Sequence, residues 1–265
     1  MRDMSSDRPT GVALLEALEA GVVRAAEPDP EGGWLVHAWV KEEILALFRA
    51  SEIVPQGLEG TSPPFAFRDK EPLTIRRFED EDGVRIVPGG SAVRRGAHLA
   101  PGVVCMPPMY VNIGAWVGEG SMIDSHALVG SCAQVGAGVH VSAGAQIGGV
   151  LEPAGARPVI VEDGAFLGAN TGVFDGVLIG RGAVLAAGLV LTRGTVVHDL
   201  VNESLLRGDP DRPLEIPPGA VVVPGSRPVS GDYGRKHGLT AACGLIVKYR
   251  DERTDAATAL EEALR

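Results

Sequence analysis

The 265-residue sequence has few cysteines and no long apolar run. Its three cysteines, Cys105, Cys132 and Cys243, are too few for a disulfide framework and form no CxxC pair. A reducing, cytoplasmic compartment is therefore expected. No stretch approaches the 18 or so apolar residues of a membrane span, and the N-terminus has no apolar signal core. The sequence thus predicts neither a membrane protein nor an exported one.

Aromatic residues and positive charge are also scarce. Aromatics make up 5% of the chain, against 36 glycines and 19 prolines, so any core must be built from small aliphatic side chains. The formal net charge of −10 argues against a protein that coats nucleic acid or an anionic membrane, because such partners favour a basic surface.

What the sequence does contain is an aliphatic residue at every sixth position. Of 17 register positions, 16 are Val, Leu or Ile. They are Val93, Leu99, Cys105, Val111, Val117, Ile123, Val129, Val135, Val141 and Ile147, then Val161, Leu167, Val173, Ile179, Leu185, Leu191 and Val197. Neither a helix, with a period of 3.6, nor an alternating strand selects every sixth residue.

Three positions after these aliphatics the residue is usually Gly or Asn, which tolerate positive φ. Each hexad therefore predicts a short strand followed by a tight corner. Three corners close a triangular coil of 18 residues, and 17 hexads give nearly six coils of parallel β-helix. The period does not fix the handedness, and the general crossover rule would make it right-handed.

The pattern divides the chain into three predicted parts. Residues 1–84 lack the period and carry helix-spaced apolar residues, which predicts a small, mainly helical N-terminal domain. Residues 85–223 form the β-helix, with insertions at 149–160 and 198–215 that we expect to be ligand-covering loops. Residues 224–265 form an extended segment and a short acidic helix near 254–264.

Several strings resemble one acyltransferase family, the 2,3,4,5-tetrahydropyridine-2,6-dicarboxylate N-succinyltransferases of bacterial lysine and diaminopimelate biosynthesis. The strings are RIVPGGSAVRRGAHLAPGVV at 85–104, YVNIGAWVGEGSMID at 110–124, VGSCAQVG at 129–136 and IGGVLEP at 147–153. The segments at 34–49 and 246–265 are also similar, so the likeness covers nearly the whole chain.

The resemblance implies a mainly β fold, a left-handed parallel β-helix of hexapeptide repeats. It also implies a homotrimer with active sites between neighbouring β-helices, succinyl-CoA as co-substrate with no permanently bound cofactor, and ring-opened 2-amino-6-oxopimelate as acceptor. In the family's R-V-V-P and M-V-D strings the arginine and the aspartate bind the dicarboxylate. Those positions are Arg85 and Asp124 here.

The chemistry of acyl transfer assigns a role to Asp124. An attacking amine must lose a proton, so a base is needed. Asp124 follows the inward Ile123, so strand alternation points it outward. Without the SMID context a solvated aspartate is the simpler interpretation. Arg85 offers a bidentate fork for a carboxylate, although pairing with the acidic run at 79–82 is the alternative.

A second carboxylate is often found in the family's G-A-R-S-E string, but this chain has GANTG, with Asn170 and Gly172 in place of the arginine and the glutamate. Glu152 and Asp175 are possible substitutes, and for each a carboxylate bonding its own loop is equally plausible.

For coenzyme A, the corner amides near Ala187 and Gly188 are candidates to hold the thioester oxygen. Residues 176–250 carry nine basic and six acidic side chains, a local charge of +3 that includes Arg227, so the anionic cofactor is expected along the C-terminal half. A solvated mixed-charge surface is the alternative.

Other functions remain open at this stage. A zinc carbonic anhydrase on the same fold is disfavoured because the six histidines include no H-x4-H pair, so no metal is expected. His126, at a corner position, either lines the cleft or fills space, and Cys132 has no partner for nucleophilic catalysis. An acetyl-CoA-dependent enzyme acting on the same intermediate, an amino-sugar acyltransferase and a non-catalytic solenoid scaffold are the competing functions.

Overall fold

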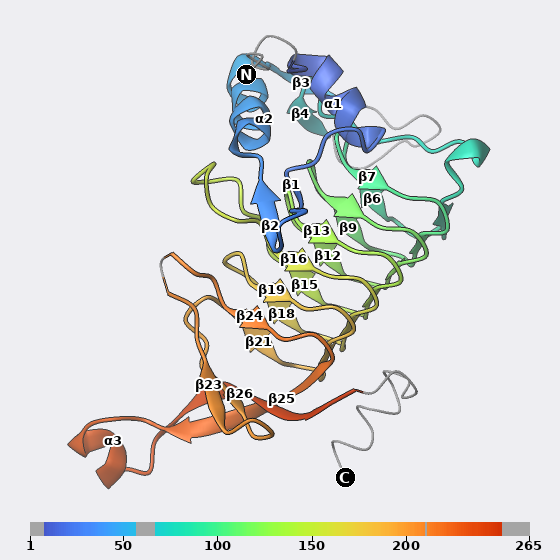
Figure 1. Cartoon of the computed structure of the whole chain (residues 1–265). Coiled ribbons are helices and arrows are strands. Elements are labelled where there is room, and N and C mark those ends of the chain that lie inside the picture. Colours follow the sequence, from blue (N-terminus) through green and yellow to red (C-terminus); the bar gives the residue numbers. More distant parts are fainter. Residues whose placement is uncertain (1–7, 57–66, 210, 251–265) are drawn as a thin grey trace.

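The computed structural model describes residues 8–56, 67–209 and 211–250. Over these residues the chain winds down a triangular prism whose three faces are parallel sheets (Figure 1). Sheet I contains β6 (Ala92–Val93), β9 (Tyr110–Val111), β12 (Leu128–Val129), β15 (Gln146–Ile147), β18 (Gly172–Val173) and β21 (Val190–Leu191). Sheet II contains β7 (His98–Leu99), β10 (Trp116–Val117), β13 (Gln134–Val135), β16 (Ile160–Val161), β19 (Leu178–Ile179) and β24 (Glu215–Ile216).

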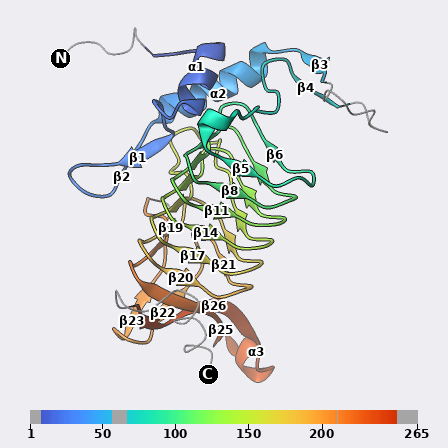
Figure 2. The same cartoon turned by 90° about the vertical axis from the view of Figure 1, so that its right-hand side faces the viewer.

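Sheet III is the longest face and is seen descending through β5, β8, β11, β14, β17 and β20 in Figure 2. It contains β5 (Arg85–Ile86), β8 (Val104–Cys105), β11 (Met122–Ile123), β14 (His140–Val141), β17 (Phe166–Leu167), β20 (Val184–Leu185) and β25 (Ala220–Pro228). Three C-terminal strands extend it: β26 (Thr240–Tyr249), β22 (Val197–Asp199) and β23 (Ser204–Leu206).

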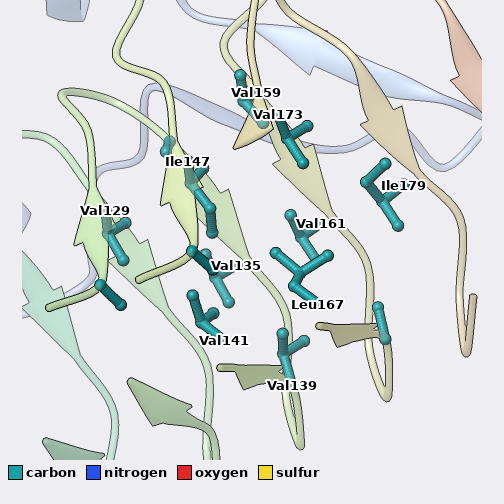
Figure 3. Close-up of a cluster of buried hydrophobic side chains, with 14 of the residues drawn as sticks. Val129, Val135, Val139, Val141, Ile147, Val159, Val161, Leu167, Val173 and Ile179 are labelled. Atoms are coloured by element: carbon teal, nitrogen blue, oxygen red, sulfur yellow. The ribbon is translucent and has the colours of Figure 1, made fainter. Parts of the chain in front are cut away.

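In each two-residue strand of the prism the second residue points inward and the first outward. The inward residues stack coil upon coil, as Val129 pairs with Ile147 and Ile147 with Val173 (Figure 3). They are fully buried at these three positions, and together they form one continuous aliphatic core. Burying a side chain of this size contributes about 1.5–3 kcal/mol. The three parallel sheets confirm the predicted fold class, and their arrangement is that of a left-handed β-helix.

The corners have the backbone geometry that the glycine pattern predicts. Most are glycines with positive φ, and four non-glycine corner residues adopt the same conformation: His126 (φ 62°), Cys132 (φ 64°), Asn170 (φ 57°) and Asp175 (φ 55°). The side chain at such a corner is strained by about 1 kcal/mol unless something compensates.

The order of the sheets along the chain defines three edges of the prism. Edge III–I is the set of corners at which the chain leaves a strand of sheet III and enters sheet I, and it includes residues 124–127, 168–171 and 186–189. The edge I–II follows the strands of sheet I, and both long insertions leave the prism there, after β15 and after β21. The predicted loop at 149–160 is confirmed.

The N-terminal segment covers the upper part of edge I–II. It contains α1 (Gly11–Glu19) and α2 (Ala38–Ala50), as the helix-spaced apolar residues of this region predict. Their buried side chains pack on Ile113 and Cys132 of two successive corners. The sequence did not predict its two small antiparallel hairpins, β1–β2 (Ala26–Pro28 with Trp34–Val36) and β3–β4 (Ile53–Pro55 with Arg68–Lys70).

Arg24 fixes the start of hairpin β1–β2 on the outer face of sheet II. Its guanidinium lies 3.9 Å from the ring centroid of Trp116, and its Nε donates to Gln134 Oε1 at 3.0 Å. Trp34 Nε1 of the same hairpin donates to Glu162 Oε1 at 3.0 Å. One face of the prism is therefore covered by this chain's own N-terminal segment.

The C-terminal part differs from the prediction in one respect. Residues 198–215 were expected to be a loop, but β22 and β23 form an antiparallel hairpin whose strand β22 pairs with β26. Asp199 closes its turn by accepting the backbone N–H groups of Val201 and Asn202, an Asx arrangement that the sequence analysis overlooked.

Strand β25 runs through position 223 into a long hairpin with β26, which carries α3 (Asp232–Lys236) at its tip. The acidic helix predicted at 254–264 lies outside the described residues. None of the helices among the residues that the structure describes is long and apolar enough to cross a membrane.

Candidate active site

Asp124 stands on edge III–I at the end of β11, pointing out of the prism as expected. Its side chain is 30% exposed. Its Oδ1 accepts the backbone N–H of Ser125 at 2.7 Å, and its own carbonyl accepts the N–H of Ala127 at 3.1 Å. The corner that follows, with φ of 62° at His126, turns the chain away immediately. One carboxylate oxygen is therefore held by the backbone, and Oδ2 is left to face other groups.

The group that Oδ2 faces is His140, which the sequence analysis did not single out. His140 is the outward residue of β14, one rung below Met122 of β11. Its Nε2 lies 3.8 Å from Asp124 Oδ2. The edge of its ring contacts Phe166 on the other side, with the ring centroids 5.2 Å apart. The 18-residue coil repeat could have revealed this neighbour, because it places position 140 directly beside position 122.

Arg85 lies on the same sheet as Asp124. It is the outward, exposed residue of β5, which pairs with β8, which pairs with β11. Two rungs correspond to about 10 Å along the prism. Asp82 of the neighbouring acidic run pairs with Arg76 instead, at 3.2 Å. Among the described residues no carboxylate contacts the Arg85 guanidinium, which is available for an anionic ligand.

Glu152 lies at a different edge from Asp124. It is exposed in the insertion between β15 and β16, on edge I–II. This insertion is held against α2, where the fully buried Lys41 donates its Nζ to the carbonyl of Ala156. Asp175, the other proposed second carboxylate, follows β18 and also belongs to edge I–II. Within one chain the fold does not bring either carboxylate to Asp124.

Gly172 lies on the outer face of sheet I, at the position where the family's G-A-R-S-E string has its glutamate. The ring of Phe174 occupies the space that a side chain would need. A Cβ at position 172 would lie 2.6 Å from the Phe174 ring, and one at Gly148 would lie 2.6 Å from the same ring. A glutamate side chain at position 172 would therefore collide with the Phe174 ring where that ring now lies.

Ala187 and Gly188 lie on edge III–I, the same edge as Asp124, exposed at a corner about three rungs below it. The expected role of the Gly188 amide has to be corrected. Its N–H donates to the carbonyl of Ala169 at 2.9 Å, because corner amides bond to the coil above, and it is not free to hold a ligand. The N–H of Ala187 has no acceptor among the described residues.

Arg227 is remote from that corner in the fold. It lies on the hairpin formed by β25 and β26, opposite Ala241. Its Nε is buried and has no hydrogen-bond partner in the described part of the chain.

The cysteines and histidines do not form an alternative centre. Burial raises the pKa of the Cys105 and Cys132 thiols to about 12, so neither provides a thiolate nucleophile at neutral pH. Within residues 8–56, 67–209 and 211–250 no three His, Cys, Asp or Glu side chains converge to hold a metal ion.

Two family models match parts of this chain. Residues 5–50 match the family described as "Tetrahydrodipicolinate N-succinyltransferase N-terminal", and residues 158–193 match "Hexapeptide repeat of succinyl-transferase". A crystal structure from Campylobacter jejuni, assigned as a 2,3,4,5-tetrahydropyridine-2-carboxylate N-succinyltransferase, is similar at 20% identity and a TM-score of 0.48. That similarity covers 97% of this chain and 65% of that one.

Two curated relatives are similar over almost their whole length. The 2,3,4,5-tetrahydropyridine-2,6-dicarboxylate N-succinyltransferase of Polynucleobacter asymbioticus is 44% identical over 257 residues, which are 96% of this chain and 88% of that protein. The enzyme of the same name from Afipia carboxidovorans is 40% identical over 255 residues, 95% of this chain and 87% of the other. The chain thus belongs to the 2,3,4,5-tetrahydropyridine-2,6-dicarboxylate N-succinyltransferases, a family of hexapeptide-repeat acyltransferases.

Proposed function

We propose that this chain transfers a succinyl group from succinyl-CoA to the amine of ring-opened tetrahydrodipicolinate, 2-amino-6-oxopimelate, with Asp124 as the general base. The observation that carries the proposal is the 44% identity to a named N-succinyltransferase across 96% of the chain. The reaction belongs to diaminopimelate and lysine biosynthesis.

The base acts as the amine attacks. The nitrogen adds to the thioester carbonyl and the N–H proton passes to Asp124 Oδ2. The C–S bond then breaks, and the departing sulfur takes this proton from Asp124 and leaves as the thiol of coenzyme A. Oδ2 is the oxygen for this step because Oδ1 is already bonded to the Ser125 N–H. A positioned base of this kind typically contributes a factor of about 100 to 10,000 in rate.

Arg85 binds one carboxylate of the acceptor. Its guanidinium lies on the same sheet as Asp124, about two rungs or 10 Å away, a separation that a seven-carbon dicarboxylate with its amine beside one carboxylate and its ketone beside the other can span. This places the amine, which is beside one carboxylate, near the base.

The working unit in this proposal is a homotrimer whose sites lie between adjacent prisms. Asp124 and Arg85 come from one copy, and Glu152 comes from the edge I–II insertion of the next copy. Asp124 lies on edge III–I and Glu152 on edge I–II. A head-to-tail ring brings unlike surfaces of neighbouring copies together, so these two edges can meet between copies.

Coenzyme A lies along the lower part of edge III–I. The Ala187 N–H holds the thioester oxygen, and Arg227 contributes positive charge for the phosphates from the β25–β26 hairpin. The local charge of +3 over residues 176–250 supports this placement. The nearest alternative is an acetyl-CoA-dependent enzyme acting on the same acceptor.

The test is turnover of the purified protein with the cyclic imine and either succinyl-CoA or acetyl-CoA, followed as thiol release. We expect kcat/KM for succinyl-CoA to exceed that for acetyl-CoA at least tenfold. A preference for acetyl-CoA would overturn the choice of donor. Absence of turnover with both donors, together with no rise in melting temperature on addition of coenzyme A, would support a non-catalytic scaffold.

A further inference from the structure

His140 carries a buried polar atom that the proposed reaction does not yet use, although its side chain as a whole is 39% exposed. Its Nε2 is inaccessible to solvent and has no hydrogen-bond partner among the described residues. Leaving a buried polar atom without a partner destabilises the folded chain. A fold that retains such an atom needs a reason for it.

The geometry around the ring aims Nε2 at one group. The strands packed against β14 are β11 and β17. From β17 the apolar ring of Phe166 meets the imidazole edge-on, and from the β11 side Asp124 Oδ2 lies 3.8 Å away. The nearest acids that precede β17 are engaged elsewhere, since Glu162 accepts from Trp34 and Asp163 pairs with Arg181 at 3.0 Å.

We infer that His140 is a positioning residue for Asp124: its Nε2–H donates to Oδ2 when substrate fills the site. This inference rests on the proposed function, in which Asp124 is the base. The two atoms need to approach by less than 1 Å to reach a hydrogen bond of ordinary length, and catalytic hydrogen bonds are often long until substrate binds. With Oδ1 held by Ser125 and Oδ2 by His140, the carboxylate has one orientation toward the amine.

The residue proposed to position Asp124 is also distant from the residue proposed to bind the acceptor carboxylate. His140 does not lie beside Arg85, which is three rungs away along sheet III, so loss of the imidazole leaves the carboxylate-binding arginine in place. The expected defect is therefore in kcat rather than in KM.

Two substitutions test this. His140→Phe keeps the ring and its contact with Phe166 but has no donor, whereas His140→Gln keeps a donor close to the Nε2 position. Both are assayed with succinyl-CoA and the cyclic imine, and both are titrated with pimelate as a non-reacting dicarboxylate. Melting temperature and oligomer size report whether the variants fold.

We expect His140→Phe to lose 10- to 100-fold in kcat while its Kd for pimelate and its KM stay within twofold of the unmodified chain. His140→Gln should recover kcat to within about fivefold. In the Asp124→Asn background, His140→Phe should cost no further activity, because the carboxylate that it positions is gone.

Two results would overturn the inference. One is a His140→Phe variant within threefold of normal kcat, and the other is an equal loss in the Phe and Gln variants. Failure of the proposed function has a different signature, since the unmodified chain would then neither turn over succinyl-CoA nor bind pimelate.

Discussion

Asp124 and Glu152 lie at two different edges of the same triangular prism. Asp124 follows a strand of sheet III, and Glu152 belongs to the insertion that follows a strand of sheet I. The insertion is anchored to the N-terminal helices by Lys41 and by packing of Leu151. A site that uses both carboxylates therefore has to combine two copies of the chain.

This division predicts complementation between two inactive variants. Asp124→Asn and Glu152→Gln are co-expressed with different tags, and mixed trimers are purified. If each site takes Asp124 from one copy and Glu152 from the next, about one third of the sites in each mixed trimer regain both groups. We expect activity to return toward that fraction.

The control for complementation is a mixture of Asp124→Asn with the double variant, in which no chain retains the aspartate and no activity should return. Absence of recovery in the test mixture would place both carboxylates on one copy, whereas an active Glu152→Gln homotrimer would remove Glu152 from the site.

Gly172 and Phe174 should be energetically coupled. A Cβ at position 172 approaches the Phe174 ring to 2.6 Å, so Gly172→Ala forces the ring to move and should lower the free energy of unfolding by about 1–2 kcal/mol. After Phe174→Ala the same substitution should cost less than about 0.5 kcal/mol. Gly155→Ala is the matched control, because a Cβ there meets no atom within 4 Å. Equal costs with and without the Phe174 ring would refute the coupling.

Lys41 should make stability depend on alkaline pH. Burial lowers the pKa of its ammonium group from the ordinary value of 10.5. Between the lowered pKa and 10.5 the unfolded chain binds more protons than the folded one, so the penalty of the buried charge disappears as pH rises through that window. The free energy of unfolding of the unmodified chain should therefore rise relative to Lys41→Met.

Urea unfolding of both proteins at several pH values between 7 and 10.5 measures this difference. The Cys105 thiol and Tyr110 are present in both proteins, and their contributions cancel. The Cys132 thiol interacts with Lys41, but burial raises its pKa to about 12, above the range of the measurement. A difference that stays flat, or falls with pH, contradicts a destabilised ammonium at position 41.

His126 should be replaceable by glycine. Its φ of 62° suits glycine, its side chain is exposed, and no described residue bonds its imidazole. His126→Gly should leave kcat within about twofold and raise the free energy of unfolding by up to about 1 kcal/mol, because the corner strain is relieved. A tenfold loss of kcat would instead place the imidazole in the cleft.

The hexad period predicted the prism because each aliphatic position repeats the same local choice, an inward side chain followed by a turn that glycine permits. From the sequence alone, the period therefore predicted that Ile123 lies in the core and Asp124 outside it. It also placed the corner residues His126 and Cys132 correctly. Position along a repeating coil is a local property, and the sequence carries it directly.

Other features depend on contacts between distant segments, which no period encodes. The Gly188 N–H donates to the carbonyl of Ala169 one coil above. Whether this N–H could bind a ligand therefore depended on how successive coils stack. Hairpin β1–β2 is held by Arg24 on Trp116 and Gln134, which lie about a hundred residues further along the chain. The coil repeat places His140 beside Met122, but the lack of a hydrogen-bond partner for its Nε2 among the described residues is a property of the folded structure alone.

The most direct test of the account is the kcat of Asp124→Asn for succinyl transfer to the cyclic imine, measured on protein whose melting temperature and oligomer size match those of the unmodified chain. The account predicts a loss of at least 100-fold, because the asparagine amide cannot accept the amine proton. A kcat within threefold of the unmodified value would show that the proton leaves by another route and that edge III–I is not the catalytic centre.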